Sequence, residues 1–336
     1  MNKNRRARYV LLMLAIMAFG LAGCTVPQSV FDPKGPMAQI PLDLLWMSVW
    51  VMTFVTVVVA VILVIVLIRF RTRKGEENVI PEQTEGSTKL ELVWVVIPAV
   101  LLTILAIPTV KAAYEIAEVP QGSDVLHVKV TGKQYWWEFE YPELGIITAN
   151  EMHIPAGEDV RVSLESTDVV HSFWVPKLAG KLDNIPGQTN YMKLHASEPG
   201  TYSGQCAELC GPSHALMAFQ VVAHKPGDFD NWVEKMKNPE TKPKTALAED
   251  GEKIFAKSCA SCHAIEGTDS KGRMGPDLTG FGNRKRLAAH IMDNNRENLI
   301  KWIQQPQKIK PGNKMPDTGM SDEQAEALAE YLEGLK

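Results

Sequence analysis

The chain has few cysteines and little net charge, and each of these features excludes a class of protein. Five cysteines in 336 residues are too few and too scattered for a disulfide-stapled scaffold. A net charge of −4 lacks the basic excess of a nucleic-acid-binding domain, so no nucleic-acid partner is expected. Charged residues make up 22% and hydrophobic ones 45%, which excludes a disordered chain. At roughly 100–200 residues per domain, the length allows two or three domains.

The mean hydropathy of −0.09 conceals two long apolar runs in the first third of the chain. Residues 44–68 and 92–110 contain no charged side chain, and about 20 apolar residues suffice to cross a bilayer as a helix. A buried core helix is the alternative for each. The loop 69–91 between them is basic, which predicts that it is cytoplasmic and that the residues after about 111 are extracytoplasmic. Its basic residues are Arg69, Arg71, Arg73, Lys74 and Lys89.

The N-terminus has the pattern of a secretory signal. Basic residues from Lys3 to Arg8 precede an apolar run, Val10 to Phe19, which is too short to span a membrane. The following Leu-Ala-Gly-Cys, ending at Cys24, resembles the bacterial lipobox, in which the cysteine receives lipid. We therefore expect a lipoprotein signal peptide over 1–23 and an extracytoplasmic segment over 24–43. A plain signal peptide with a chance cysteine is the alternative.

The middle of the chain changes to a period of two, which is typical of half-buried strands. Val160–Glu165 alternates apolar and polar residues, and Leu126–Val130 and Phe219–Val222 are similar. Pro-Gly and Pro-Ala-Gly turn signals separate these runs. Several short strands with such spacing predict an all-β sandwich or barrel over residues 122–226.

A group of soft metal ligands lies near the end of this domain. Cys206, Cys210, His214 and Met217 fall within twelve residues, and thiolate with thioether favours copper. Two thiolates on one loop can bridge two copper ions, an arrangement that needs a second histidine. His171, at the start of an apolar strand, is the best candidate. A zinc site and a Cys206–Cys210 disulfide are the alternatives.

The apolar hairpin and this loop together resemble subunit II of the haem–copper cytochrome c oxidases over residues from about 40 to 225. Residues 206–217 match that family's copper A motif, Cys-x-Glu-x-Cys-x3-His-x2-Met, without a gap. The resemblance implies a cupredoxin fold, a dinuclear copper A, and partner subunits I and III. It implies that the Glu208 carbonyl binds copper and that its side chain reaches a magnesium site shared with subunit I. The implied side-chain copper ligands are His171, Cys206, Cys210, His214 and Met217.

The resemblance also assigns roles outside the copper loop. Glu91, beside the second apolar run, resembles the family position at the mouth of a proton channel into subunit I; an interfacial charge is the alternative. Tyr135 and Trp136 resemble the family's aromatic cluster on the route by which electrons reach copper A. The family commonly has tryptophan where this chain has Tyr135, and such clusters also serve as packing anchors.

The last third has the signature of a cytochrome c. Cys259-x-x-Cys262-His263 is the c-type haem attachment motif; a thioredoxin-like motif would need a βαβ pattern, which is missing. Met274, Met315 and Met320 are candidates for the second axial ligand. Asn-Lys-Met315-Pro resembles the distal loop of class I cytochromes c, which favours Met315. We expect a polar linker over 227–246 that leaves the domain orientation open. An all-α class I cytochrome c domain is expected over 247–336.

The combination resembles the bacterial caa-type oxidases, whose subunit II carries its own cytochrome c. It implies a path from an external donor to haem c, to copper A and to subunit I, where oxygen is reduced and protons are pumped. Two other functions remain open at this point. One is the copper A subunit of a nitric-oxide reductase, and the other is a membrane-anchored copper-delivery lipoprotein, which would need no haem.

Overall fold

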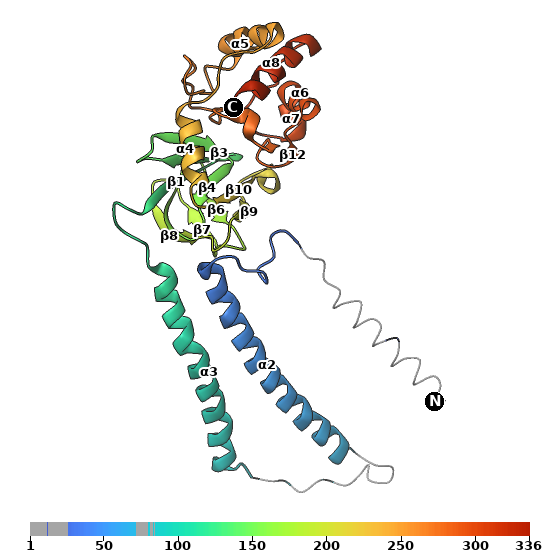
Figure 1. Ribbon diagram of the computed structural model, residues 1–336. Coiled ribbons are helices and arrows are strands. Elements are labelled where there is room, and N and C mark those ends of the chain that lie inside the picture. The colour runs from blue at the N-terminus through green and yellow to red at the C-terminus, as the bar shows by residue number, and fades with distance from the viewer. Residues whose placement is uncertain (1–11, 13–25, 72–79, 81–82, 84) are drawn as a thin grey trace.

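The computed structural model describes residues 12, 26–71, 80, 83 and 85–336. Within these residues the chain forms a helical hairpin, a β-sandwich and a mostly helical C-terminal domain, in that order (Figure 1). The fold class therefore agrees with the sequence-based prediction. Cys24 and, apart from Leu12, the predicted signal peptide lie outside the described residues.

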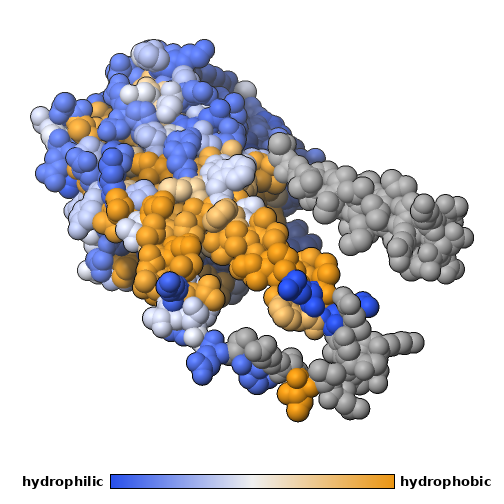
Figure 2. All heavy atoms as spheres, turned by 90° about the horizontal axis from the view of Figure 1, so that it is seen from below, coloured by the Kyte–Doolittle hydropathy of each residue, from blue (hydrophilic) through white to orange (hydrophobic). Residues whose placement is uncertain are grey.

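The hairpin consists of α2 (Pro36–Arg69) and α3 (Thr88–Ala117), both long and apolar enough to cross a membrane. Their most apolar stretches are not buried in the protein, and Figure 2 shows their hydrophobic surface below a hydrophilic domain. Both helices extend beyond the predicted spans, 44–68 and 92–110. The prediction counted only charge-free residues, whereas helical hydrogen bonding continues through flanking charged residues. The predicted loop 69–91 is correspondingly shorter, because its last four residues are helical.

The start of α2 is fixed to the β-sandwich. Lys34 donates a backbone hydrogen bond to the carbonyl of Lys177 (2.6 Å) and accepts one from Ser197 (2.8 Å). Met37, in the first turn of α2, is buried and belongs to the sandwich core. The hairpin is therefore attached to the β-domain by packing as well as by the covalent chain.

The sandwich contains two five-stranded sheets, as the period-two pattern predicts. Most neighbouring strands are antiparallel, but β1 pairs with β5, and β4 with β10, in parallel. The first sheet has the order β3 (Ile146–Ala149), β2 (Trp136–Tyr141), β1 (Leu126–Lys133), β5 (Asp159–Ser166) and β8 (Asn190–His195). The second has the order β4 (Glu151–Pro155), β10 (Ala218–His224), β9 (Gly200–Cys206), β6 (His171–Trp174) and β7 (Leu182–Asn184).

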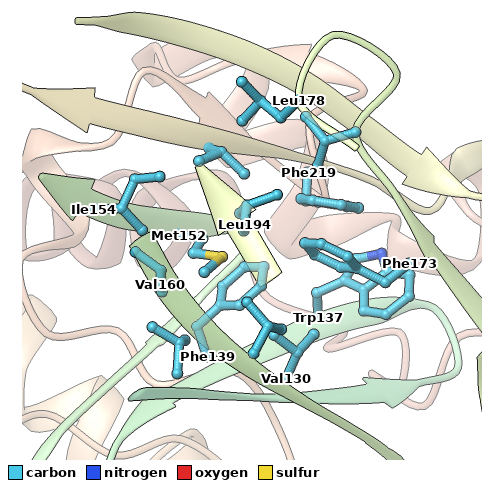
Figure 3. Packing of buried hydrophobic residues seen from close by; sticks show 14 of the residues in the cluster. Val130, Trp137, Phe139, Met152, Ile154, Val160, Phe173, Leu178, Leu194 and Phe219 are labelled. Carbon is cyan, nitrogen blue, oxygen red and sulfur yellow. The ribbon is translucent and has the colours of Figure 1, made fainter. Parts of the chain in front are cut away.

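Aromatic side chains from both sheets meet in the sandwich core. Trp137 of β2 is fully buried, and its ring centroid lies 5.8 Å from that of Phe173 and 5.2 Å from that of Phe219 (Figure 3). Each fully buried aromatic side chain contributes on the order of 150–250 Å² of buried surface. This core lies beside β6 and β9, which carry His171 and Cys206 and pair with each other in antiparallel fashion.

The C-terminal domain is built around two crossing helices, α5 (Ala246–Ser258) and α8 (Asp322–Gly334). Ser321 and Gln324 form a capping box at the start of α8. Smaller elements complete the domain: 3₁₀ turn η2 (Phe281–Asn283), the two-residue strands β11 (Arg286–Leu287) and β12 (Met292–Asp293), α6 (Arg296–Gln304) and α7 (Pro306–Ile309).

The predicted linker, 227–246, is wrong over its first half. Residues 228–237 form the helix α4 (Asp228–Lys237), and Trp232 stacks on His153 at 4.4 Å between ring centroids. The second half is held by paired backbone hydrogen bonds between Glu240 and Lys336. The segment looked like a linker because its composition is polar. Its apolar residues nevertheless recur at helical spacing and face the sandwich: Phe229, Trp232, Val233 and Met236.

Candidate metal and haem centres

The predicted copper ligands converge at one end of the sandwich. His171 begins β6, Cys206 ends β9, and the loop after β9 carries the others, including 3₁₀ turn η1 (His214–Leu216). Cys206 Sγ lies 3.8 Å from His171 Nδ1 and 3.8 Å from Cys210 Sγ. Cys210 Sγ lies 3.6 Å from His214 Nδ1 and 3.8 Å from Met217 Sδ.

These distances suit atoms that share metal ions. Two ligands about 2.0–2.3 Å from one ion at a tetrahedral angle lie about 3.3–3.8 Å apart. His171, Cys206 and Cys210 are buried, and their ligand atoms all lie within 4.8 Å of one another. Met217 is also buried, and His214 is half-buried. Both cysteines are free thiols in this structure, which disagrees with the disulfide alternative. The donor set of two thiolates, two imidazoles and a thioether fits copper better than zinc.

Asp168 orients one of these imidazoles. Its carboxylate accepts hydrogen bonds from His171 Nε2 (2.8 Å) and from the backbone N–H groups of Gln134 (2.7 Å) and Val169 (2.8 Å). Burial would raise the pKa of Asp168, but these hydrogen bonds outweigh it and lower the pKa strongly. Burial would likewise lower the pKa of His171, yet the hydrogen bonds to Asp168 and Cys206 raise it. With Nε2 engaged by the carboxylate, Nδ1 is the nitrogen that faces the cysteines.

The pKa values of the two neighbouring thiols shift in opposite directions. The pKa of Cys206 is lowered chiefly because Cys210 donates a hydrogen bond to its sulfur, and His171 adds to the effect. The pKa of Cys210 is raised for the reciprocal reason. Thiolate is the form that binds metal, so the lowered pKa of Cys206 favours metal binding at this sulfur.

Glu208 lies between the two cysteines, and its two polar groups have different surroundings. Its backbone carbonyl oxygen is 3.2 Å from Cys206 Sγ, within the cluster. Its side chain is half-buried and makes no hydrogen bond or ion pair with any residue that the structure describes. The carbonyl is therefore placed as the resemblance implies. No magnesium ligand set forms around the side chain within the described part of this chain.

Three residues beside the copper cluster were given no individual role from the sequence, although two of them lie within residues 132–139, which resemble the family's aromatic cluster. Trp137 contacts the His171 ring (6.0 Å between centroids) and directs its indole N–H at the Met217 carbonyl (3.4 Å). Gln134 donates from Nε2 to the Cys210 carbonyl (2.6 Å). Asp168 is the third. Its position three residues before His171 was the only sequence signal, because the other contacts join segments far apart in the chain.

The haem attachment motif lies at the end of α5. Cys259 and Cys262 are half-buried, and the motif closes in a turn in which the Cys262 and His263 N–H groups both donate to the Cys259 carbonyl at 3.0 Å. His263 Nδ1 donates to the Pro276 carbonyl (2.8 Å), which leaves Nε2 for an axial bond to iron. Gly275 is needed there, because a Cβ would lie 2.6 Å from His263 Cε1. The arrangement fits a covalently held haem.

The three candidate methionines occupy different environments. Met274 is 69% exposed, and Met320 packs against the hydrophobic core of the C-terminal domain. Met315 is half-buried in an ordered loop: its N–H donates to Asn313 Oδ1 (2.8 Å), and its carbonyl accepts from Gln307 Nε2 (2.7 Å). Met315 therefore lies in a hydrogen-bonded loop, and its role as the second axial ligand stays a prediction.

The remaining predicted site residues are spread over the molecule. Tyr135 is buried between the β-domain and the C-terminal domain, and its carbonyl accepts a hydrogen bond from Lys310. Trp136 is half-buried, with the Lys133 ammonium 4.8 Å from its ring centroid. Glu91 is exposed in the first turn of α3, at the end of the helix far from the β-domain (Figure 1).

The fold and these two ligand sets define a class of protein. A membrane-anchored chain with a copper-binding sandwich and a c-type cytochrome domain, the two packed together, belongs to the electron carriers of respiratory membranes. Comparison with known proteins narrows this class. Three family profiles match: the transmembrane domain of cytochrome c oxidase subunit II over residues 35–112, its periplasmic domain over 145–224, and cytochrome c over 248–336.

Relatives match over almost the whole chain. The cytochrome c oxidase subunit 2 of Alkalihalophilus pseudofirmus is 44% identical over 333 residues, which cover 97% of this chain and 96% of the relative. That of Bacillus subtilis is 42% identical, with 97% of both chains covered. A solved periplasmic domain of subunit II of a Bradyrhizobium japonicum cytochrome oxidase is 33% identical. It covers 36% of this chain and 98% of that chain, with a TM-score of 0.34.

This chain belongs to the cytochrome c oxidase subunit II family, in the form that carries a fused cytochrome c domain, and is a subunit of the oxidase complex. Membership implies copper A in the sandwich and haem c in the C-terminal domain, as the sequence predicts.

Proposed function

We propose that electrons enter a terminal haem–copper oxidase through this chain, passing from an external donor to its haem c, then to dinuclear copper A, and on to subunit I. Subunit I would reduce oxygen to water with coupled proton pumping. Haem c and copper A, when bound, supply one-electron redox chemistry that protein side chains lack. The observation that carries the proposal is the direct contact between the two centres' loops: Ser213, next to His214, donates a hydrogen bond to the Pro311 carbonyl (2.6 Å), four residues before Met315.

The chain's own residues would hold both centres rigidly. His171, Cys206, Cys210, His214 and Met217 would bind copper with the Glu208 carbonyl. Cys259 and Cys262 would bond covalently to haem, with His263 and Met315 as axial ligands. A buried, preformed ligand cage limits rearrangement on electron transfer, which favours a fast exchange.

The membrane arrangement is part of the same proposal. The hairpin loop would face the cytoplasm, since Arg69, Arg71 and Lys89 lie at or next to the helix ends that this loop joins, and both redox domains would lie on the extracytoplasmic side. Cys24 would carry lipid after removal of residues 1–23. Membrane-impermeant labelling of single cysteines placed in the loop and in the haem domain would test the orientation. Mass spectrometry of the N-terminal peptide would test lipidation.

Contacts with partner subunits are proposed for three positions. Glu208 would reach a magnesium ion at the subunit I interface, since its side chain is free of partners among the described residues. Glu91 would stand at the mouth of a proton channel in subunit I. Tyr135 and Trp136 would lie on the electron route into copper A. Subunit III would complete the complex.

Quantifying cofactors in the purified oxidase tests the central claim. We expect two coppers and one c-type haem in this subunit, with an electron paramagnetic resonance (EPR) signal from mixed-valence copper. One copper and no c-type haem spectrum would instead support the copper-delivery lipoprotein. Consumption of nitric oxide without oxygen uptake would support the nitric-oxide reductase. Oxygen uptake that stops when copper A is selectively removed supports the oxidase.

A further inference from the structure

A buried lysine lies at the contact between the two redox domains and has no assigned role. Lys310 is the residue that follows α7, and only 3% of its surface is exposed. Its ammonium donates to the Tyr135 carbonyl of the copper domain (2.5 Å) and to the Ala288 carbonyl of the haem domain (3.2 Å). Burial lowers the pKa of Lys310 to about 7. No carboxylate pairs with it within the part of the chain that the structure describes.

A buried ammonium without a carboxylate is a poor source of stability. Removing it from water is costly, and two carbonyl hydrogen bonds only partly offset that cost. An apolar side chain of the same length would avoid the cost of burying a charge, but it would leave both carbonyls without a donor. What Lys310 supplies, and an apolar residue does not, is a directional bond from one domain to the other.

The segment that Lys310 begins reaches the copper cluster at two further points. Pro311 accepts the hydrogen bond from Ser213, and the Lys314 ammonium lies 3.7 Å from Asp168, the carboxylate that orients His171. Met315 follows directly. One short stretch, 310–315, therefore carries the proposed haem ligand and contacts neighbours of the copper ligands.

The second acceptor of Lys310 belongs to an unusual loop. Ala288, Ala289 and His290 all have left-handed φ angles, 54°, 60° and 66°, which non-glycine residues rarely adopt. This loop also faces the copper domain, with His290 Nε2 3.9 Å from Glu151. Lys310 thus joins two haem-domain segments to one carbonyl of the copper domain.

We propose that Lys310 is a positioning residue that locks the haem domain onto the copper domain in the orientation used for electron transfer. The inference rests on the proposed function, since it assumes that haem c delivers electrons to copper A. The alternative is that Lys310 only stabilises the fold of the haem domain.

The test compares the variants Lys310→Met and Lys310→Gln with Lys308→Met in the whole oxidase complex. Lys308 is exposed in α7, two residues away, and makes no ion pair or hydrogen bond within the described residues, so it is a matched control. After photoreduction of haem c, its reoxidation and the reduction of copper A are followed by absorbance. Haem potential and the copper EPR signal are recorded in parallel.

We expect Lys310→Met to slow this internal transfer by about tenfold or more, because it leaves the buried carbonyls of Tyr135 and Ala288 without their hydrogen-bond donor, a loss that weakens a contact by roughly that factor. The domains stay tethered, so transfer should not vanish. Lys310→Gln is shorter but keeps a donor, and should fall between Met and wild type. The haem potential and copper signal should not change, and Lys308→Met should match wild type.

Wild-type transfer rates in both Lys310 variants would overturn the proposal. Loss of haem or copper from these variants would also overturn it, since Lys310 would then be a folding residue. Failure of the proposed function can be told apart from failure of this inference. It would appear in the wild-type complex itself, as a missing dinuclear copper signal or as no electron transfer from haem to copper.

Discussion

Replacing Asp168 by Asn tests whether the copper site depends on the carboxylate that orients His171. The carboxylate accepts from His171 Nε2 through one oxygen and from the Gln134 N–H through the other. An amide has one oxygen and one NH₂ group. In either orientation of the amide, its NH₂ group would point at one of the two hydrogen-bond donors, His171 Nε2 or the Gln134 N–H. The negative charge is lost in either orientation.

The magnitude follows from these contacts. A hydrogen bond to a charged group contributes about 1.5–3 kcal/mol, so the metal-free domain should lose stability of that order. Mutating the hydrogen-bond partner of a metal-binding histidine commonly lowers the metal affinity by about 10–100-fold. We therefore expect Asp168→Asn to weaken copper binding by that factor, equivalent to about 1.4–2.8 kcal/mol.

The assay is competition for copper between the purified full-length chain and a chelator of known affinity, with copper per chain and EPR recorded together. Asp159→Asn is the matched control. Asp159 also bonds a histidine, His195, at 2.8 Å, but the pair joins β5 and β8 and contacts no copper ligand. Equal copper retention in the two variants would refute the reasoning that Asp168 supports the site through His171.

Three further predictions concern the cytochrome domain and its contact with the sandwich. Met315→Ala should lower the haem midpoint potential in a redox titration, because an axial Met raises it, whereas Met320→Ala should lower stability only. Gly251→Ala should destabilise the domain to heat by about 1–3 kcal/mol, because the new Cβ would lie 2.0 Å from the Ala327 carbonyl, while Gly334→Ala, with open space around it, should not. Burial raises the pKa of Glu151 above 4.5. Its ionised form therefore opposes folding above that pH, and Glu151→Gln should raise the melting temperature at pH 7 but not at pH 4.

The candidate ligands can be located in the sequence because their chemistry requires most of them to be neighbours in the chain. Cys206, Cys210, His214 and Met217 share one loop, and Cys259, Cys262 and His263 share one turn. The fixed spacing of these residues in the sequence then reflects the distances that the ligands need around the metal or the haem. His171 lies 35 residues before Cys206 and was found only because the motif still needed a second imidazole.

The residues that orient the ligands could not be predicted in this way. Asp168 meets Gln134, and Lys310 meets Tyr135, only after strands or domains far apart in the chain have been brought together. Nothing in the spacing marks those pairs. For α4 the sequence carries two conflicting signals: the polar composition indicates a linker, whereas the apolar spacing of three and four residues indicates the helix that forms.

The position of α4 changes how the two redox domains are related. A free linker would make their encounter depend on its length and stiffness. Instead, Trp232 packs on the sandwich, and Glu240 pairs with Lys336 at the end of the chain, so both halves of the segment are held. At the opposite side of the sandwich, Met37 of the membrane hairpin packs into the hydrophobic core of the sandwich. The copper domain is therefore attached by packing to both neighbours, and the separation between haem and copper is set by side-chain contacts rather than by the reach of a tether.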